Sequence, residues 1–160
     1  MNKLGIDIGR VIIAPSNGNQ DTSFLKGDND AALATPAMPN ALETISQLVS
    51  LFENNVWLVS KASPIIQEKT RMWLQYHHFF QITGMSECNI RFCLQRKDKA
   101  QICQELSITH FIDDRMAVLE HLRELVPNRY LFGKQKPNFV CPKNVIPVLS
   151  WEDVLNILTK

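Results

Sequence analysis

The chain has 160 residues, enough for one domain with a full hydrophobic core that needs no disulfide or metal to hold it. Apolar residues make up 45% and charged residues 21%, so the composition excludes a disordered chain and is typical of a globular protein. The net charge of +1 disfavours a dedicated nucleic-acid binder. No apolar stretch approaches the roughly 18 residues of a membrane helix, and no basic start precedes a long apolar region. We therefore expect a cytoplasmic protein with no membrane partner.

The cysteines and histidines show no metal-binding pattern. No pair has the CxxC spacing, and no combination matches a zinc site. Adjacent histidines at 77 and 78 cannot share one helix face, so we interpret them as ordinary structural or surface residues. We predict reduced cysteines that pack as small apolar residues. These are Cys88, Cys93, Cys103 and Cys141.

The first predicted strand covers residues 4–8 and contains one acid, Asp7. After a break at Gly9 and Arg10, the apolar residues 11–13 are expected to continue as a strand. Residues 14–36 are rich in Ser, Asn, Gly, Asp and Pro and show little periodicity, which predicts a polar flap or a rudimentary cap segment. Loops of this length inside a compact domain are usually functional or disordered.

A helix is expected to begin near Pro39, a residue favoured in the first turn, and to end at residues 54–55. Its apolar residues keep the spacing of one helix face. They are Leu42, Ile45, Leu48, Leu51 and Phe52. Residues 56–59 then form a buried strand that ends at Ser60.

The rest of the chain alternates between helix and strand. Ser63 and Pro64 are a good cap and first-turn pair for the next helix. Strands are expected over 90–94, 110–112 and 129–132, and helices from Lys99, over 116–125 and over 151–158. This alternation predicts an α/β fold: a doubly wound, mostly parallel, Rossmann-like sheet with helices on both faces. We expect one domain over 1–160.

Polar residues stand where the predicted strands end or helices start, at Asp7, Ser60, Lys99 and the pair Asp113 and Asp114. The carboxyl ends of strands in a doubly wound sheet lie on one edge, so these residues can converge. Carboxylates from separate strands are the oxygen ligands that Mg²⁺ prefers. A hydroxyl and an ammonium suit the oxygens of a phosphate, and a carboxylate can attack phosphorus to form an acyl phosphate.

Each of these residues also has a structural interpretation. Ser60 could end its strand, Lys99 could be an exposed lysine at a helix start, and Asp113 and Asp114 could cap the following helix. Asp7 is harder to explain in this way, because an acid inside an apolar strand is costly without a partner.

The four motifs together resemble the haloacid dehalogenase-like superfamily, whose members are mostly Mg²⁺-dependent phosphatases. Its first motif, a strand followed by DxDx(T/V), resembles residues 7–11, and its second, a strand ending in Ser or Thr, resembles residues 56–60. Its third, a lysine at a helix start, is matched by Lys99, with Lys97 as the alternative. Its fourth, a strand ending in two acids, resembles residues 110–114.

The resemblance implies a role for each residue and Mg²⁺ as the cofactor. Asp7 would be the nucleophile and a metal ligand, and Gly9 would offer its backbone carbonyl to the metal. Asp114 would be a metal ligand, with Asp113 beside it or acting through water. The residues expected to hold the phosphate are Ser60, Lys99 and Arg10. The implied activity is phosphomonoester hydrolysis through an aspartyl-phosphate intermediate.

Gly9 departs from the family pattern, because most members carry a second Asp there that protonates the leaving group and later activates water. Such general acid–base help is worth about 10²–10⁴-fold. Arg10 stays protonated and cannot replace that Asp, although it can bind an anion. Two alternatives therefore stay open: a metal- or phosphate-binding interaction module with little or no turnover, and another family chemistry that needs no second Asp. With only 14–36 as a cap, we expect an open site.

Overall fold

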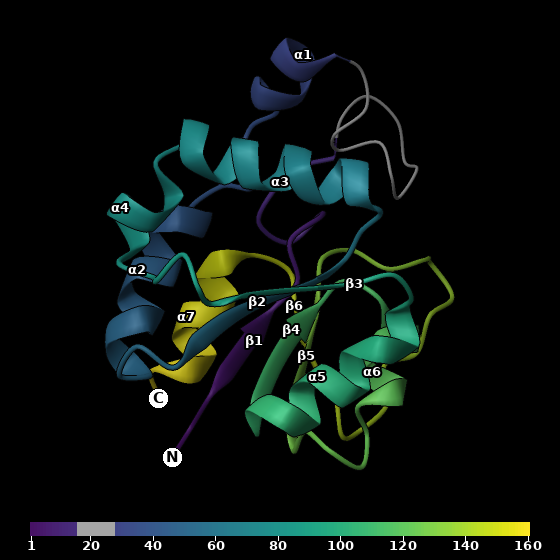
Figure 1. Cartoon of the computed structure of the whole chain (residues 1–160). Coiled ribbons are helices and arrows are strands. Elements are labelled where there is room, and N and C mark those ends of the chain that lie inside the picture. The colour runs from purple at the N-terminus through teal and green to yellow at the C-terminus, as the bar shows by residue number, and fades with distance from the viewer. Residues whose placement is uncertain (16–27) are drawn as a thin grey trace.

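The computed structural model describes residues 1–15 and 28–160 (Figure 1). Its centre is a six-stranded sheet in the order β3-β2-β1-β4-β5-β6, and each neighbouring pair of strands is parallel. The strands are β1 (Leu4–Ile6), β2 (Val56–Lys61), β3 (Ile90–Cys93), β4 (His110–Asp113), β5 (Asn128–Phe132) and β6 (Ile146–Val148). The prediction of a doubly wound parallel sheet is confirmed.

Helices cover both faces of this sheet. In Figure 1, α2 and α7 lie on one face and α5 and α6 on the other, while α3 crosses above the carboxyl edge of the strands with α1 above it. None of the described helices has both the length and the apolar character needed to cross a bilayer. The helices are α1 (Asn29–Leu33), α2 (Ala41–Leu51), α3 (Pro64–Tyr76), α4 (Phe79–Thr83), α5 (Lys99–Leu106), α6 (Met116–His121) and α7 (Trp151–Leu158), and a short 3₁₀-helix, η2 (Arg96–Asp98), precedes α5.

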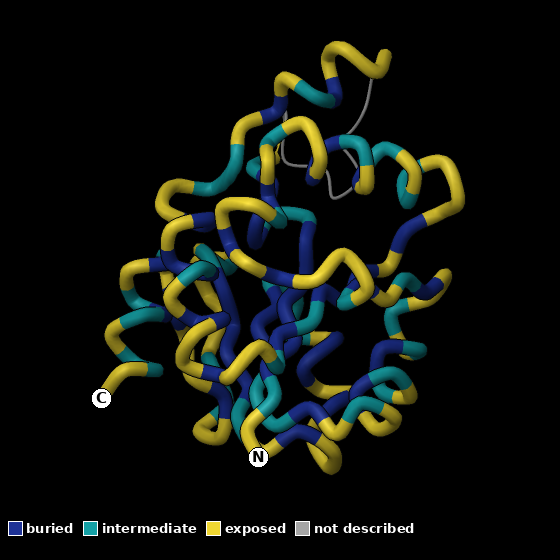
Figure 2. Tube along the Cα trace, turned by 60° about the vertical axis from the view of Figure 1, so that its left-hand side comes forward, coloured by how far each residue is buried: buried dark blue, intermediate teal, exposed yellow. Residues whose placement is uncertain are grey.

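The two faces have separate hydrophobic cores, because successive residues of a strand point to opposite sides. Leu58 of β2 packs in the core under α2 and α7, whereas its neighbour Val59 packs in the core under α5 and α6. In β4, Ile112 packs in the first of these cores and Phe111 in the second. Figure 2 shows buried segments through the middle of the molecule and exposed ones along its outer helices and turns.

The predicted helix boundaries hold best where a capping residue fixes them. Ser63 accepts a hydrogen bond from the Ile66 amide at the start of α3, as expected. The helix expected to run to residues 54–55 ends at Leu51, because Glu53 and Asn54 adopt positive φ values of 53° and 68°.

Residues 11–13 do not continue the first strand, so that expectation was wrong. The chain turns at Arg10, whose φ is 65°, and the amides of Ile12 and Ile13 donate to the Ile8 carbonyl at 2.8 and 3.1 Å. The Trp151 indole donates to the carbonyl of Val11 at 2.7 Å and fixes the turn to α7. These residues are apolar because the turn is buried in the core, not because they form a strand.

The predicted polar segment 14–36 includes one helix, α1, in its second part. Residues 16–27 lie outside the described residues. Trp73 of α3 donates to the Thr35 carbonyl at 2.8 Å, and a ring nitrogen of His77 lies 2.8 Å from the Leu33 carbonyl, so α3 fixes residues 33–35. His77 therefore has a structural role, as predicted.

Other boundaries also differ from the prediction: β1 ends at Ile6, β2 extends to Lys61, and α6 ends at His121 rather than at residue 125. The bounds of β3, β4 and β5 differ by one residue each.

Substituting Gly5 with Ala is expected to destabilise the fold by about 1–3 kcal/mol, the usual cost of overpacking a core. A Cβ at Gly5 would lie 2.6 Å from Cδ2 of Phe111 in the neighbouring strand. Urea denaturation of G5A measures the effect. In the double variant G5A/F111L the loss should be smaller than the sum of the two single losses, because the overlap is gone. Additive losses would contradict this explanation.

Candidate active site

Asp7, Ser60 and Asp113 lie at the carboxyl ends of β1, β2 and β4, which are neighbours in the sheet. Ile6, the last residue of β1, is level with Leu58 of β2 and Ile112 of β4. The Asp7 amide donates to the Ile112 carbonyl at 3.0 Å, which fixes the residue directly after the strand. The strand order places β1 between its two partners, where such sheets bind ligands.

Lys99, the first residue of α5, joins two of the acids. Its Nζ lies 3.1 Å from Oδ1 of Asp7 and 2.8 Å from Oδ2 of Asp113. The other Asp113 oxygen accepts the Arg115 amide at 2.9 Å, and the Asp113 side chain is fully buried. Burial alone would lower the pKa of the Lys99 ammonium, but the two carboxylates outweigh it and raise that pKa. Lys99 therefore carries a fixed positive charge beneath Asp7.

The carboxylates of Asp7, Asp113 and Asp114 lie within 4.8 Å of one another. Burial, the Asp7 charge and a hydrogen bond with Asp7 raise the pKa of Asp114 to about 9, and burial and the Asp7 charge raise the pKa of Asp113 to about 6. Lys99 pairs with two of these acids, yet the pKa values of Asp113 and Asp114 stay raised, so the cluster favours an added cation. Closely spaced carboxylate oxygens with surplus negative charge fit a Mg²⁺ ion.

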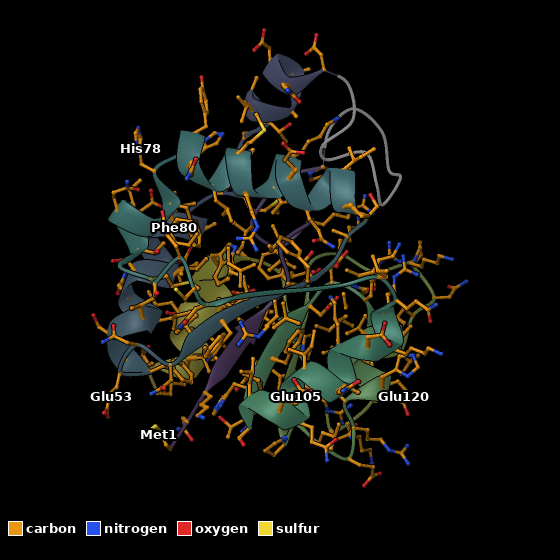
Figure 3. The ribbon with its side chains drawn as sticks, in the orientation of Figure 1. Met1, Glu53, His78, Phe80, Glu105 and Glu120 are labelled. Atoms are coloured by element: carbon orange, nitrogen blue, oxygen red, sulfur yellow. The ribbon has the colours of Figure 1, made fainter. Side chains whose placement is uncertain are left out.

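A cavity of about 160 Å³ opens above these residues. Asp7, Gly9 and Ser60 line it, together with Asp114. It is also lined by five basic residues, which outnumber its acids: Arg10, Lys61, Arg96, Lys99 and Arg115. Figure 3 places Glu105 and Glu120 on α5 and α6, away from this edge of the sheet. The cavity therefore combines a candidate cation site at its base with a positively charged wall, which suits a phosphate.

Solved structures with the same architecture identify the fold. A D,D-heptose 1,7-bisphosphate phosphatase from Burkholderia thailandensis matches 100% of this chain and 100% of that chain, with a TM-score of 0.62 and 14% identity. A haloacid dehalogenase-like family hydrolase from Xanthomonas campestris matches 99% of this chain and 95% of its own, with a TM-score of 0.67 and 8% identity. The chain has the haloacid dehalogenase-like fold.

Two further comparisons agree with this fold. A hydrolase of the same superfamily from Ehrlichia chaffeensis has a TM-score of 0.61 and 12% identity over 99% of this chain and 98% of its own. A protein from Oceanobacillus iheyensis, named a putative nucleotidase, is 25% identical over 120 residues. That match covers 75% of this chain and 60% of the relative, so the chain spans less than two thirds of it. No family model matches the chain.

The haloacid dehalogenase-like fold brings the predicted site residues together. Asp7, Gly9, Arg10, Ser60, Lys99 and Asp114 line the cavity, and Asp113 lies beneath it, bound to Lys99. Lys97, the alternative to Lys99, is exposed and does not line the cavity. The roles implied by the family resemblance stay predictions.

The structure also tests the purely structural explanations of Ser60, Lys99 and the two neighbouring aspartates. β2 continues past Ser60 to Lys61, so Ser60 does not end its strand. Lys99 is 2% exposed and is not a surface lysine. Arg115, not an aspartate, occupies the N-cap position of α6, and Asp113 binds the Arg115 amide just before that helix.

Three basic residues of the cavity were missed in the sequence: Lys61, Arg96 and Arg115. Each lies within three residues of a predicted site residue, with Lys61 directly after Ser60 and Arg115 directly after Asp114. A search of the residues that follow each strand end would have found them, because the chain turns over the sheet edge there.

Proposed function

We propose that the chain is a Mg²⁺-dependent phosphohydrolase that acts on phosphomonoesters, with Asp7 as the nucleophile and an aspartyl phosphate as the intermediate. The observation that carries the proposal is the position of the Asp7 carboxylate, next to the Lys99 ammonium at the base of a cavity with a basic wall. The fold shared with a heptose bisphosphate phosphatase and the relative named for nucleotidase activity both support it.

Each residue has a chemical role in this proposal. Asp7 attacks phosphorus while the bond to the leaving oxygen breaks, and water then hydrolyses the acyl phosphate to return the carboxylate. Ser60 and Arg10 bind phosphate oxygens, and Lys99 holds Asp7 in place and offsets negative charge. Asp7, Asp114 and the Gly9 carbonyl would hold Mg²⁺, with Asp113 acting through water. When bound, the ion offsets charge on the phosphoryl oxygens.

The test is phosphate release from 4-nitrophenyl phosphate with Mg²⁺ and with excess EDTA. The proposal expects release that depends on the metal.

A second candidate function has one observation in its favour: Gly9 places no side chain where an acid–base residue is needed. That candidate is a metal- or phosphate-binding interaction module. A broad panel of phosphomonoesters that gives no release, with Mg²⁺ still bound, would favour it over the enzyme.

Mg²⁺ is also expected to raise the melting temperature, because it relieves repulsion among the three carboxylates and binds the folded state. At 100 times its Kd a ligand stabilises by about 2.7 kcal/mol, which is roughly 5–10 °C for a domain of this size. Differential scanning fluorimetry measures the shift. Asp114→Asn should remove most of it, whereas Asp30→Asn, an exposed acid of α1, should keep it. An equal shift with KCl at matched ionic strength would show that no specific site exists.

A further inference from the structure

The basic residues of the cavity come from both sides of Asp7. Asp7 directly follows β1, which lies between β2 and β4 in the sheet. Arg115 follows β4 by two residues, whereas Lys61 is the last residue of β2 and Arg96 follows β3 by three residues. Neighbouring strands are about 4.8 Å apart, so the ends of β3 and β4 are roughly 14 Å apart across the sheet. The positive charge therefore extends along the cavity instead of gathering at one point.

Arg10 and Arg115 belong to the part of the cavity nearest Asp7. Burial lowers the pKa of the Arg115 guanidinium, the Asp7 charge opposes this, and the Arg10 charge lowers the pKa further, so the three groups lie within electrostatic reach of one another. Together with Ser60 and Lys99, they surround the position proposed for the transferred phosphate. These donors and Mg²⁺ would occupy the terminal oxygens of one phosphoryl group.

Lys61 and Arg96 form a second basic pair, on the side of β2 and β3. Lys61 is level with Cys93, the last residue of β3, and Arg96 begins η2 three residues further on. Both line the cavity, as does Ser63 at the N-terminus of α3, where the helix dipole adds partial positive charge. Lys61 is exposed and Arg96 is half-buried, so a ligand that enters the cavity has access to both. A guanidinium has several N–H donors, so Arg96 can bind such a ligand and keep its interaction within the protein.

We propose that the substrate is a phosphomonoester with a second anionic group, a phosphate or a carboxylate, which binds Lys61 and Arg96 while the reacting phosphate lies at Asp7. The inference rests on the proposed phosphohydrolase function and narrows it by substrate class. The planar fork of an arginine fits either anion, and a lysine adds a point charge. Because this contact lies away from the reacting phosphorus, it strengthens binding of the substrate and of the transition state alike and lowers KM.

The first test compares kcat/KM for three esters with the same three-carbon spacer: 3-hydroxypropyl phosphate, 3-phosphooxypropanoate and propane-1,3-diol bisphosphate. Free Mg²⁺ is kept constant and saturating, because bisphosphates bind the ion in solution. We expect an ester with a second anion to exceed the hydroxypropyl ester by about 10–100-fold, mainly through KM, which is the usual worth of a hydrogen bond to a charged group. The better of the two esters identifies the anion. The bisphosphate has two equivalent phosphates, so a twofold gain alone counts against the inference.

The second test reads the ratio of kcat/KM for the preferred ester to that for the hydroxypropyl ester, which does not depend on the fraction of folded protein. Lys61→Gln and Arg96→Gln should each lower this ratio by about tenfold, whereas Lys61→Arg keeps the charge and should keep the ratio. The matched control is Lys97→Gln, because Lys97 is exposed next to Arg96 in η2 and does not line the cavity. An unchanged ratio in both Gln variants of the basic pair would contradict the inference.

The outcomes separate the two proposals. Equal kcat/KM for the three esters, or release from 4-nitrophenyl phosphate alone, would leave the phosphohydrolase intact and overturn the inference. If no phosphate is released from 4-nitrophenyl phosphate or from any of the three esters, the proposed function itself fails, and the inference fails with it.

Discussion

Replacing Asp7 with Asn should abolish Mg²⁺-dependent phosphate release from 4-nitrophenyl phosphate, with a fall in kcat/KM of about 10⁴-fold or more, as expected when a nucleophile is removed. The amide oxygen of Asn is a poor nucleophile and cannot form the acyl phosphate. A colorimetric assay over a range of enzyme concentrations measures the loss. Acid quenching during turnover should trap a phosphorylated Asp7 in the original chain and none in the variant.

The Asp7→Asn variant is also expected to stay folded, which makes its loss of activity interpretable. Its side-chain oxygen can still accept the hydrogen bond that Lys99 gives Asp7 at 3.1 Å. The matched control is Asp30→Asn, which removes a carboxylate from the exposed face of α1 and should retain full activity. Undiminished release by the folded Asp7→Asn variant would exclude Asp7 as the nucleophile.

Replacing Lys99 with Met should destabilise the fold by about 3–5 kcal/mol, the cost of breaking a buried ion pair from one side. The substitution leaves Asp113 fully buried with no counter-ion and leaves Asp7 without its ammonium partner. The expected fall in melting temperature is roughly 10 °C or more. Lys97→Met is the matched control, because Lys97 is exposed in η2, four residues beyond the end of β3, and should change stability little.

The pH dependence of the stability of the Lys99→Met variant distinguishes loss of the buried ion pair from loss of packing. Burial and the Asp7 charge raise the pKa of Asp113, and Lys99 opposes them most, with a smaller contribution from the Arg115 amide. Without Lys99 the pKa of Asp113 in the folded state rises further above its value in the unfolded state, so the folded variant binds that proton more tightly than the original chain does. The stability of the variant relative to the original chain should therefore increase as the pH falls from 7 towards 5. A deficit that does not change with pH would point to packing instead.

The site could be predicted from sequence because parallel strands buried on both faces are short apolar runs that end in polar residues. Asp7 and Ser60 stand at such ends, so their convergence followed from the fold class alone. The sequence could not show which of Asp113 and Asp114 lines the cavity and which is buried beneath it. These neighbours point to different sides of the chain, and only the position of Lys99 shows which of them is buried under the cavity.

The elements missed in the sequence are short or carry mixed signals. α1 and α4 have five residues each, too few for a helical period to show, and β6 contains Pro147 at the edge of the sheet. For residues 11–13 the error was the reverse, because a strand was predicted where the structure has a buried turn. Three consecutive apolar residues are typical of a strand and of a buried turn alike, and the left-handed backbone at Arg10, which decides between them, has no signal in the residue type.

The central place of β1 also has a consequence for folding. The Asp7 and Lys99 side chains that meet at the site are 92 residues apart in the chain, and the sheet joins β1 to β4 only after most of the chain has been synthesised. Contacts between such distant segments form late, because closing a long loop costs entropy before any contact is gained. A chain in which β4 has not yet joined β1 therefore lacks the acid cluster of the site. Binding of metal or phosphate will slow unfolding without speeding the early steps of folding.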